Sequence, residues 1–166
     1  MAEPLLQGLA PVVSPHTRLL VLGSFPSVAS LAAQQYYGHP RNQFWPILAA
    51  LFGQPLADWP YARRLAFVRE QGLGIWDVHA RCRRPGSLDA DIRDAEPNDL
   101  AGLVATLPRL VLIAHNGGES ARAMRTTRAL GLPVLRLPST SPANASWSFD
   151  RKCAAWRQAF EAAGLR

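Results

Sequence analysis

The sequence predicts a three-layer α/β/α fold around a central, mainly parallel four-stranded sheet. Four short apolar runs of the kind that form strands alternate with amphipathic segments of helical spacing along the 166 residues. Each helical segment is long enough to cross over between parallel strands. We expect one domain over residues 1–166, in which residues 1–17, with three prolines, form an extended entry segment.

The strands are predicted from continuous apolar runs, which are typical of parallel strands buried on both faces. They are expected at 18–23, 73–78, 109–115 and 133–138. Helices are predicted where apolar residues recur every three or four positions. In the first of these segments, 42–53, Pro46 is tolerated in the first turn and Gly53 ends the helix. They are expected at 42–53, 61–72, 98–107, 118–130 and 149–164. Residues 81–96 are polar and carry an expected turn at Pro85 and Gly86.

The composition is that of a globular protein. Apolar residues make up 48% of the chain and charged residues 18%, and no apolar run approaches the roughly 20 residues that cross a bilayer. Cys82 and Cys153 lie far apart, which predicts neither a disulfide framework nor a metal site. We therefore expect a cytoplasmic protein without cofactor, metal or membrane contact. The net charge of +6 fits a nucleic-acid partner, although mutational bias toward Arg codons can also produce it.

Polar loops follow all four predicted strands, and they begin "GSFPS" (23–27), "DVHARC" (77–82), "HNGG" (115–118) and "LPSTSPANAS" (137–146). In parallel sheets the carboxyl ends of the strands share one edge, so the loops are expected to converge on one crevice. A further stretch, "YYGHPRNQFW" (36–45), gathers aromatic, amide and cationic side chains beside the first loop. Dinucleotide-binding, P-loop and nucleophile-elbow motifs are absent.

Two of these stretches resemble the signature motifs of a known family. "GSFPS" with "YYGHPRNQFW", and "LPSTSPANAS", are similar to the two motifs of the uracil-DNA glycosylase superfamily, and most similar to its hypoxanthine-DNA glycosylase (DNA-deoxyinosine glycosylase) branch. The resemblance runs over residues 18–163, with "GLGIWDVHARC" and "LIAHNG" in the expected order between the motifs. It implies a uracil-DNA glycosylase-like fold and a DNA partner that contains a deaminated base. It also implies hydrolytic removal of that base after it has been flipped out of the duplex.

The chain departs from the uracil-specific pattern at two positions. Phe25 stands where many members hold a water-positioning Asp or Asn, and Leu137 replaces the second-motif His. Hypoxanthine is therefore expected before uracil. The resemblance assigns the catalytic role to Asn42, whose carbonyl would orient a water beneath C1′. From the residues alone, Asn42 also fits a helix N-cap.

The expected base pocket consists of Phe25, Tyr37, Phe44, Asp77 and Asn116. Phe44 resembles the ring that stacks on the flipped base, but it also fits core packing. Asp77 falls where uracil-specific enzymes keep a base-reading Asn, so it either accepts from the N1–H of hypoxanthine or serves as a cap or an Arg partner. Asn116 is either a hydrogen-bond donor to the base or a turn residue.

Contacts with DNA are expected from small polar residues and cations within the motifs: Ser24, Ser27, His39, Arg41, Gly117, Ser139, Thr140, Ser141 and Asn144. The second motif also fits an ordinary strand-to-helix connection with Ser148 as N-cap. Lys152 is the only lysine and lies outside the motifs, so no Schiff base is expected and the abasic site should be left intact.

The sequence thus predicts a monomeric, monofunctional glycosylase of a bacterial-type cytosol, associated with the nucleoid. Three alternatives stay open. They are a lesion-binding module without catalysis, a glycosylase that mainly excises uracil, and a small-molecule hydrolase.

Overall fold

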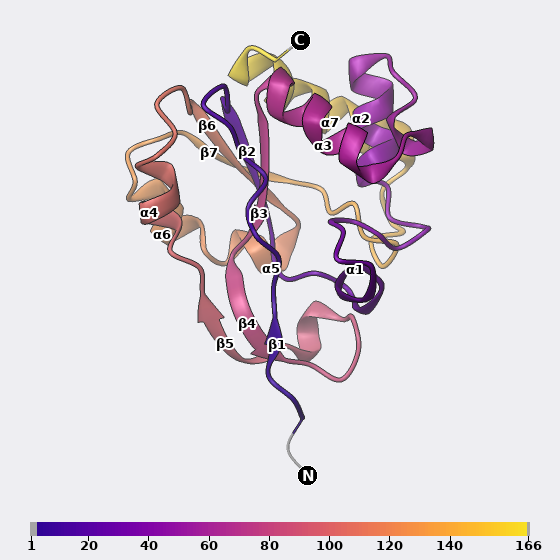
Figure 1. The fold of residues 1–166 in the computed structure, drawn as a ribbon, viewed down its shortest axis with the longest axis vertical. Coiled ribbons are helices and arrows are strands. Elements are labelled where there is room, and N and C mark those ends of the chain that lie inside the picture. Colours follow the sequence, from indigo (N-terminus) through magenta and orange to yellow (C-terminus); the bar gives the residue numbers. More distant parts are fainter. Residues whose placement is uncertain (1–2, 166) are drawn as a thin grey trace.

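The computed structural model describes residues 3–165, so Arg166 and the first two residues of the expected entry segment lie outside the described residues. It confirms the three-layer α/β/α architecture (Figure 1). The central sheet has the order β3-β2-β6-β7, and every pairing in it is parallel. Its strands are β2 (Leu19–Gly23), β3 (Leu73–Asp77), β6 (Leu112–Asn116) and β7 (Val134–Leu137).

Helices cover both faces of this sheet. One layer contains α2 (Phe44–Phe52), α3 (Tyr61–Gln71) and α7 (Phe149–Ala163), which lie together in Figure 1. The other contains α4 (Leu100–Val104), α5 (Gly118–Ala121) and α6 (Met124–Arg128). A short helix that the sequence did not predict, α1 (Val28–Ala33), follows β2, and single 3-10 turns form at η1 (Leu56–Asp58) and η2 (Asp89–Asp91).

The alternation of side chains along β2 divides the apolar interior into two cores. Leu19 and Val21 pack in the cluster that includes the side chains of α2, α3 and α7. Leu20 and Leu22 point to the opposite face and pack in a second cluster with Leu100 of α4. All five residues of β2 are buried, as the continuous apolar run predicts for a strand covered on both faces. The two cores hold the carboxyl end of β2 in a fixed place.

The helix expected over 118–130 is divided into α5 and α6, and the buried His115 of β6 packs against both. Its Nδ1 lies 2.8 Å from Ser120 Oγ and its Nε2 lies 2.9 Å from Thr127 Oγ1. Ser120 Oγ donates to Leu22 O at 2.6 Å, so it accepts from Nδ1–H, and Nε2 is left to accept from Thr127. Burial lowers the pKa of His115 to about 4, which keeps the ring neutral.

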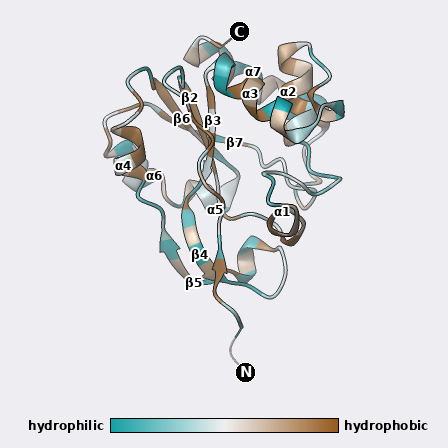
Figure 2. Cartoon of the chain, viewed as in Figure 1, coloured by the Kyte–Doolittle hydropathy of each residue, from teal (hydrophilic) through white to brown (hydrophobic). Residues whose placement is uncertain are grey.

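A second sheet forms where the sequence indicated only a polar segment with a turn. It is antiparallel, with the order β1-β4-β5, and consists of β1 (Leu6–Gln7), β4 (His79–Arg83) and β5 (Arg93–Pro97). Every residue of β5 is exposed, so the strand lacks the apolar alternation from which strands are predicted. Figure 2 shows β5 in the hydrophilic colour next to β4, in contrast to the brown strands of the central sheet farther up in the view. Within residues 3–165, none of the helices is both long enough and apolar enough to cross a membrane.

Candidate active site

A cavity of about 890 Å³ opens where the four parallel strands end. The last residue of each strand lines it: Gly23, Asp77, Asn116 and Leu137. The loops that follow β2, β6 and β7 also contribute lining residues. The topology therefore gathers both motif loops around one space, as the carboxyl ends of parallel strands require.

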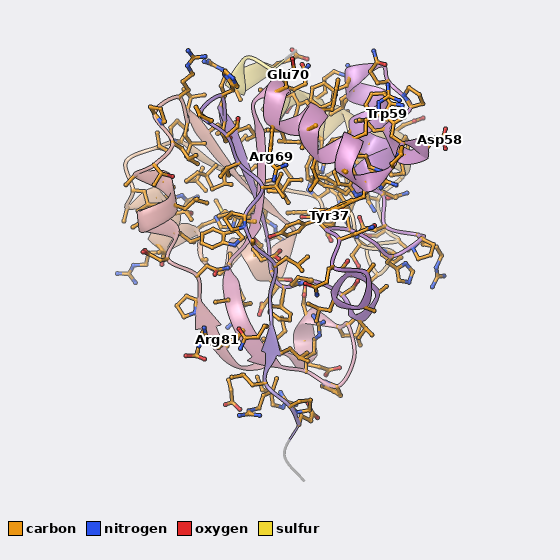
Figure 3. The ribbon with its side chains drawn as sticks, viewed as in Figure 1. Tyr37, Asp58, Trp59, Arg69, Glu70 and Arg81 are labelled. Atoms are coloured by element: carbon orange, nitrogen blue, oxygen red, sulfur yellow. The ribbon has the colours of Figure 1, made fainter. Side chains whose placement is uncertain are left out.

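The tyrosine pair of the first motif is fixed by buried hydrogen bonds. Tyr36 donates its hydroxyl to Ala10 O at 2.8 Å, and Trp45 Nε1 donates to Tyr36 O at 3.0 Å. Tyr37 adopts a left-handed backbone with φ of 55°, which is costly for a bulky residue and is found where the surroundings fix it. Figure 3 shows Tyr37 in the middle of the molecule, and the residue lines the cavity.

Asn42 lines the cavity and also stabilises the start of α2. Its Oδ1 accepts from the backbone N–H of Phe44, the first residue of α2, at 2.9 Å, although Gln43 and not Asn42 holds the N-cap position itself. A carbonyl oxygen has two lone pairs, and one remains for a further donor. The next residue, Gln43, donates its backbone N–H to Thr140 O at 2.9 Å and accepts from Lys152 Nζ at 2.7 Å. These bonds tie the start of α2 to the second motif and to α7.

The expectation that Phe44 contacts a base needs correction. Its side chain is completely buried and does not line the cavity, because the ring of Tyr37 stacks on it at a centroid distance of 4.0 Å. Phe44 also packs edge-on against Trp45 and Trp156. Phe44 is therefore a core residue that supports Tyr37. Phe25 does line the cavity, and the Arg84 guanidinium lies 5.3 Å from its ring centroid.

Asn116 fastens the second motif to the sheet. Its Nδ2 donates to Thr140 Oγ1 at 3.0 Å and to Tyr37 Oη at 3.2 Å, and its Oδ1 accepts from Thr140 N at 3.0 Å. Both amide hydrogens are thus engaged, so Asn116 lines the cavity without the spare donor that the sequence had suggested. Because Tyr37 Oη accepts from Asn116, the hydroxyl hydrogen of Tyr37 remains available instead.

Asp77 is the buried carboxylate of the cavity, with 4% of the residue exposed. Its Oδ2 has no hydrogen-bond partner within residues 3–165, and no ion pair joins it to an arginine there. Burial, followed by the negative charge of Asp89, raises the pKa of Asp77 to about 7, although Arg84 opposes the shift. Neither the cap nor the Arg-pair alternative describes this side chain.

Gly23 lets the polar atoms of Asp77 and Tyr37 lie close against its backbone, because a side chain at this position would collide with them. A Cβ atom at this position would lie 2.5 Å from Asp77 Oδ1 and 3.2 Å from Tyr37 Oη. The two polar atoms therefore flank the same point. Burial, followed by the Asp77 charge, raises the pKa of Tyr37, so its hydroxyl stays protonated.

Most residues expected to contact DNA line the cavity: Ser24, Ser27, His39, Gly117, Ser139, Thr140, Ser141 and Asn144. Arg41 is exposed but does not line it. Thr140 is only 1% exposed, so its burial keeps it from a phosphate, and its hydroxyl accepts from Asn116 within the loop. Ser27 accepts from Ser30 N as the N-cap of α1.

The lining residues that reasoning from the sequence missed include Asp89, Arg136 and Trp147. Asp89 lies in η2, and its Oδ1 accepts from Ser24 Oγ at 2.6 Å. Arg136 lies in β7 and approaches Gly118. Trp147 follows the second motif, and the Arg151 guanidinium stacks over its ring at 3.7 Å from the centroid. Trp147 directly follows "LPSTSPANAS" and could have been included from its position, whereas the spacing of Asp89 gave no signal.

Comparison with known proteins agrees with this geometry. Residues 10–163 match the family model described as the uracil DNA glycosylase superfamily. A protein named hypoxanthine DNA glycosylase from Methanosarcina acetivorans is 37% identical over 154 residues, which covers 93% of this chain and 97% of the relative. A protein of the same name from Methanosarcina barkeri is 37% identical over 155 residues, which covers 93% of this chain and 98% of the relative.

A solved structure has the same fold. A solution NMR structure from Methanosarcina acetivorans, described as that of a candidate uracil DNA glycosylase, superposes with a TM-score of 0.84 at 36% identity. The match covers 94% of this chain and 99% of that one. The resemblance inferred from the two motifs is thereby confirmed, and the chain belongs to the uracil-DNA glycosylase superfamily.

Proposed function

We propose that the chain is a monofunctional DNA glycosylase that flips a deaminated base out of DNA and removes it by hydrolysis, hypoxanthine most readily, leaving an abasic site. The observation that carries this proposal is the pair of polar atoms around Gly23. Asp77 Oδ1 and Tyr37 Oη both lie against Gly23, both residues line the cavity, and Tyr37 Oη accepts from Asn116, so its own hydrogen is free for a ligand. The names of the two relatives from Methanosarcina support hypoxanthine as the base.

This pair complements the edge of hypoxanthine. In its ionised form Asp77 accepts from N1–H, and the Tyr37 hydroxyl donates to O6, so each polar group of the base edge gains a partner. Adenine, the parent base, presents an unprotonated N1 that repels an ionised carboxylate. Deamination therefore converts a repulsive contact into an attractive one, which is a physical basis for selecting the lesion. Uracil presents a similar N–H and carbonyl pair and is the natural competitor.

Asn42 supplies the catalytic positioning in this proposal. Breaking the bond between C1′ and the base passes through an oxocarbenium-like sugar, and a water held beneath C1′ completes the reaction. The Asn42 carbonyl keeps a lone pair beyond its bond to Phe44 N, and its place at the start of α2 is braced through Gln43. Such a group orients the water, and losing it typically slows the reaction by about 10²- to 10³-fold.

The remaining contacts fit a flipped nucleotide. Arg136, which is exposed and lines the cavity, can bind phosphate oxygens beside the lesion together with the hydroxyls of Ser139 and Ser141. Lys152 is 2% exposed, is hydrogen-bonded to Gln43 and lies outside the cavity, so a Schiff-base mechanism has no amine there. We also propose that the protein acts as a monomer on the DNA of a cytosolic nucleoid.

The test is excision from defined duplexes. The purified protein is incubated with duplexes that carry one inosine, one uracil or neither, and abasic sites are then cleaved with alkali. We expect cleavage at inosine faster than at uracil and no cleavage of the undamaged duplex. The absence of cleavage at every deaminated base would overturn the proposal.

A lesion-binding module without catalysis is the competing candidate, and the apolar Phe25 at a position of the motif that is polar in many members favours it. That candidate predicts tighter binding to inosine-containing than to undamaged duplex, without any abasic product. A gel shift on the same duplexes, run beside the cleavage assay, separates the two.

A further inference from the structure

The loop between β4 and β5 brings a second carboxylate, Asp89, into the cavity. Asp89 opens η2 and is exposed, in contrast to the buried Asp77. Its Oδ1 accepts a hydrogen bond of 2.6 Å from the hydroxyl of Ser24, the residue next to Phe25. Both Asp89 and Ser24 line the cavity. Asp89 thus places a negative charge beside the first motif, in which Phe25 itself has no polar group.

The loop that carries Asp89 is fastened to the first motif at two further points. Arg84, only 5% exposed, donates from Nη2 to Pro26 O at 2.6 Å and from Nε to Gly86 O. Val28 N donates to Ser87 Oγ at 2.9 Å. With the bond from Ser24, these contacts hold residues 84–89 against residues 24–28. A carboxylate supported in this way has the fixed position that catalysis needs.

The reaction needs a group that can take a proton, and Asn42 cannot do so. An amide orients water through hydrogen bonds, but its carbonyl is far too weak a base to remove a proton. Asp77 is a carboxylate, but it is buried beside Gly23 and Tyr37, where the edge of the base would bind. Asp89 is the carboxylate of the cavity that solvent reaches, so a water can contact it.

We propose that Asp89 is a catalytic residue that accepts the proton of the attacking water and stabilises the positive charge on the sugar; this inference rests on the proposed function. The water oxygen forms a bond to C1′ while the C1′–N9 bond breaks. The electron pair of the C1′–N9 bond leaves with the purine. The proton released by the water passes to Asp89, and the purine leaves as the neutral base after taking a proton from solvent. Ser24 holds the carboxylate in place by its hydrogen bond.

The test is single-turnover excision of inosine by Asp89→Asn. Asparagine keeps the shape of the side chain and an oxygen that accepts from Ser24, but it cannot take a proton. We expect the rate to fall about 10²-fold or more, which is typical for the loss of a general base. The melting temperature should stay within about 1 °C of wild type, because the residue is exposed. Ser24→Ala should lower the rate by a smaller factor, about 10-fold, because the carboxylate remains but is no longer held.

Asp91→Asn is the matched control. It removes a carboxylate from the same 3-10 turn, but Asp91 does not line the cavity, so excision should stay within about 2-fold of wild type. Binding is measured with a duplex that carries 2′-fluorinated inosine, whose glycosidic bond resists hydrolysis. Asp89→Asn should bind this duplex at least as tightly as wild type, since a negative charge near phosphates is removed.

The outcomes separate this inference from the proposed function. If wild type excises inosine and Asp89→Asn excises it within about 3-fold of that rate, Asp89 only repels DNA and the inference is overturned. Equal losses in Asp89→Asn and Asp91→Asn would also overturn it, because a general charge effect would then explain both. If wild type itself fails to cleave, the proposed function falls first, and the inference falls with it.

Discussion

His115 and Asp77 are two buried titratable residues on the central sheet, and they differ in whether their polar atoms have partners. His115, with 0% exposed, has both ring nitrogens hydrogen-bonded, to Ser120 and Thr127. Asp77, with 4% exposed, has an oxygen without a partner in the described part of the chain and lines the cavity. A buried polar group that is fully paired within the protein contributes to stability. One that is left unpaired at a cavity costs stability and is available to a ligand.

Replacing His115 should produce the largest change in stability. His115→Leu removes the bridge that connects β6 with α5 and α6, and it leaves the hydroxyl of Thr127 without its ring partner. We expect the free energy of unfolding to fall by about 3 kcal/mol. Urea unfolding measures this, with His16→Leu at an exposed position as the control. Excision measured well below the melting temperature should be close to wild type, and a loss under 0.5 kcal/mol would contradict the structural role.

The dependence of stability on pH should reveal both residues. The pKa of His115 falls from 6.5 to about 4 on folding, so its contribution to stability is present above pH 6.5 and is lost as the pH falls toward 4. The pKa of Asp77 rises from 3.8 to about 7, so its contribution is present below pH 3.8 and is lost as the pH rises toward 7. The two effects oppose each other in the same range.

Asp77→Asn removes the pH-dependent contribution of Asp77 to stability and leaves that of His115. In the variant we expect the free energy of unfolding to fall by about 3 kcal/mol between pH 6.5 and 4, a steeper loss on acidification than in wild type. Urea titrations of both proteins at several pH values between 4 and 8 measure the difference. A constant difference over that range would mean that Asp77 does not have a raised pKa.

Asp77→Leu should separate stability from function. The leucine fills the site without a buried, unpaired charge, so the free energy of unfolding at pH 8 should rise by about 1 kcal/mol. The acceptor for the N1–H of hypoxanthine is lost, and affinity for the duplex with 2′-fluorinated inosine should fall about 10-fold. Unfolding in urea and a binding titration measure the two quantities. A less stable variant with unchanged affinity would make Asp77 a structural residue like His115.

The same contrast explains what could be predicted from the sequence. The central sheet was predictable because strands such as Leu19–Gly23 are apolar throughout, and Tyr37 and Asn42 could be selected because they lie in a compact motif. The bonds of His115 to Ser120 and Thr127 depend on how α5 and α6 pack against β6. The apolar spacing over 118–130 predicted one continuous helix and did not indicate this packing. Asp89 reaches Ser24 across 65 positions of sequence from the loop between β4 and β5, and the wholly exposed β5 has no apolar alternation from which a strand could be predicted.

The misassigned roles have a similar physical origin. Phe44 was expected to face the base because it lies in the motif, but its position on α2 directs it into the core, beneath Tyr37. Asn116 was expected to offer a donor, but the loop of the second motif takes both of its amide hydrogens. Sequence identifies which residue types gather at the strand ends. Which of their polar atoms are already engaged depends on tertiary contacts.

The central claim is that Asn42 orients the water that attacks the sugar, and the most direct measurement is single-turnover excision of inosine by variants of this residue. Asn42→Ala removes both the side-chain carbonyl and the cap on Phe44 N, whereas Asn42→Ser keeps a capping oxygen but not the longer amide. We predict that both variants lose about 10²-fold or more in rate, while only Asn42→Ala loses about 1 kcal/mol of stability. An Asn42→Ala protein with a lowered melting temperature and near wild-type excision would show that Asn42 is only a cap, and would contradict the mechanism.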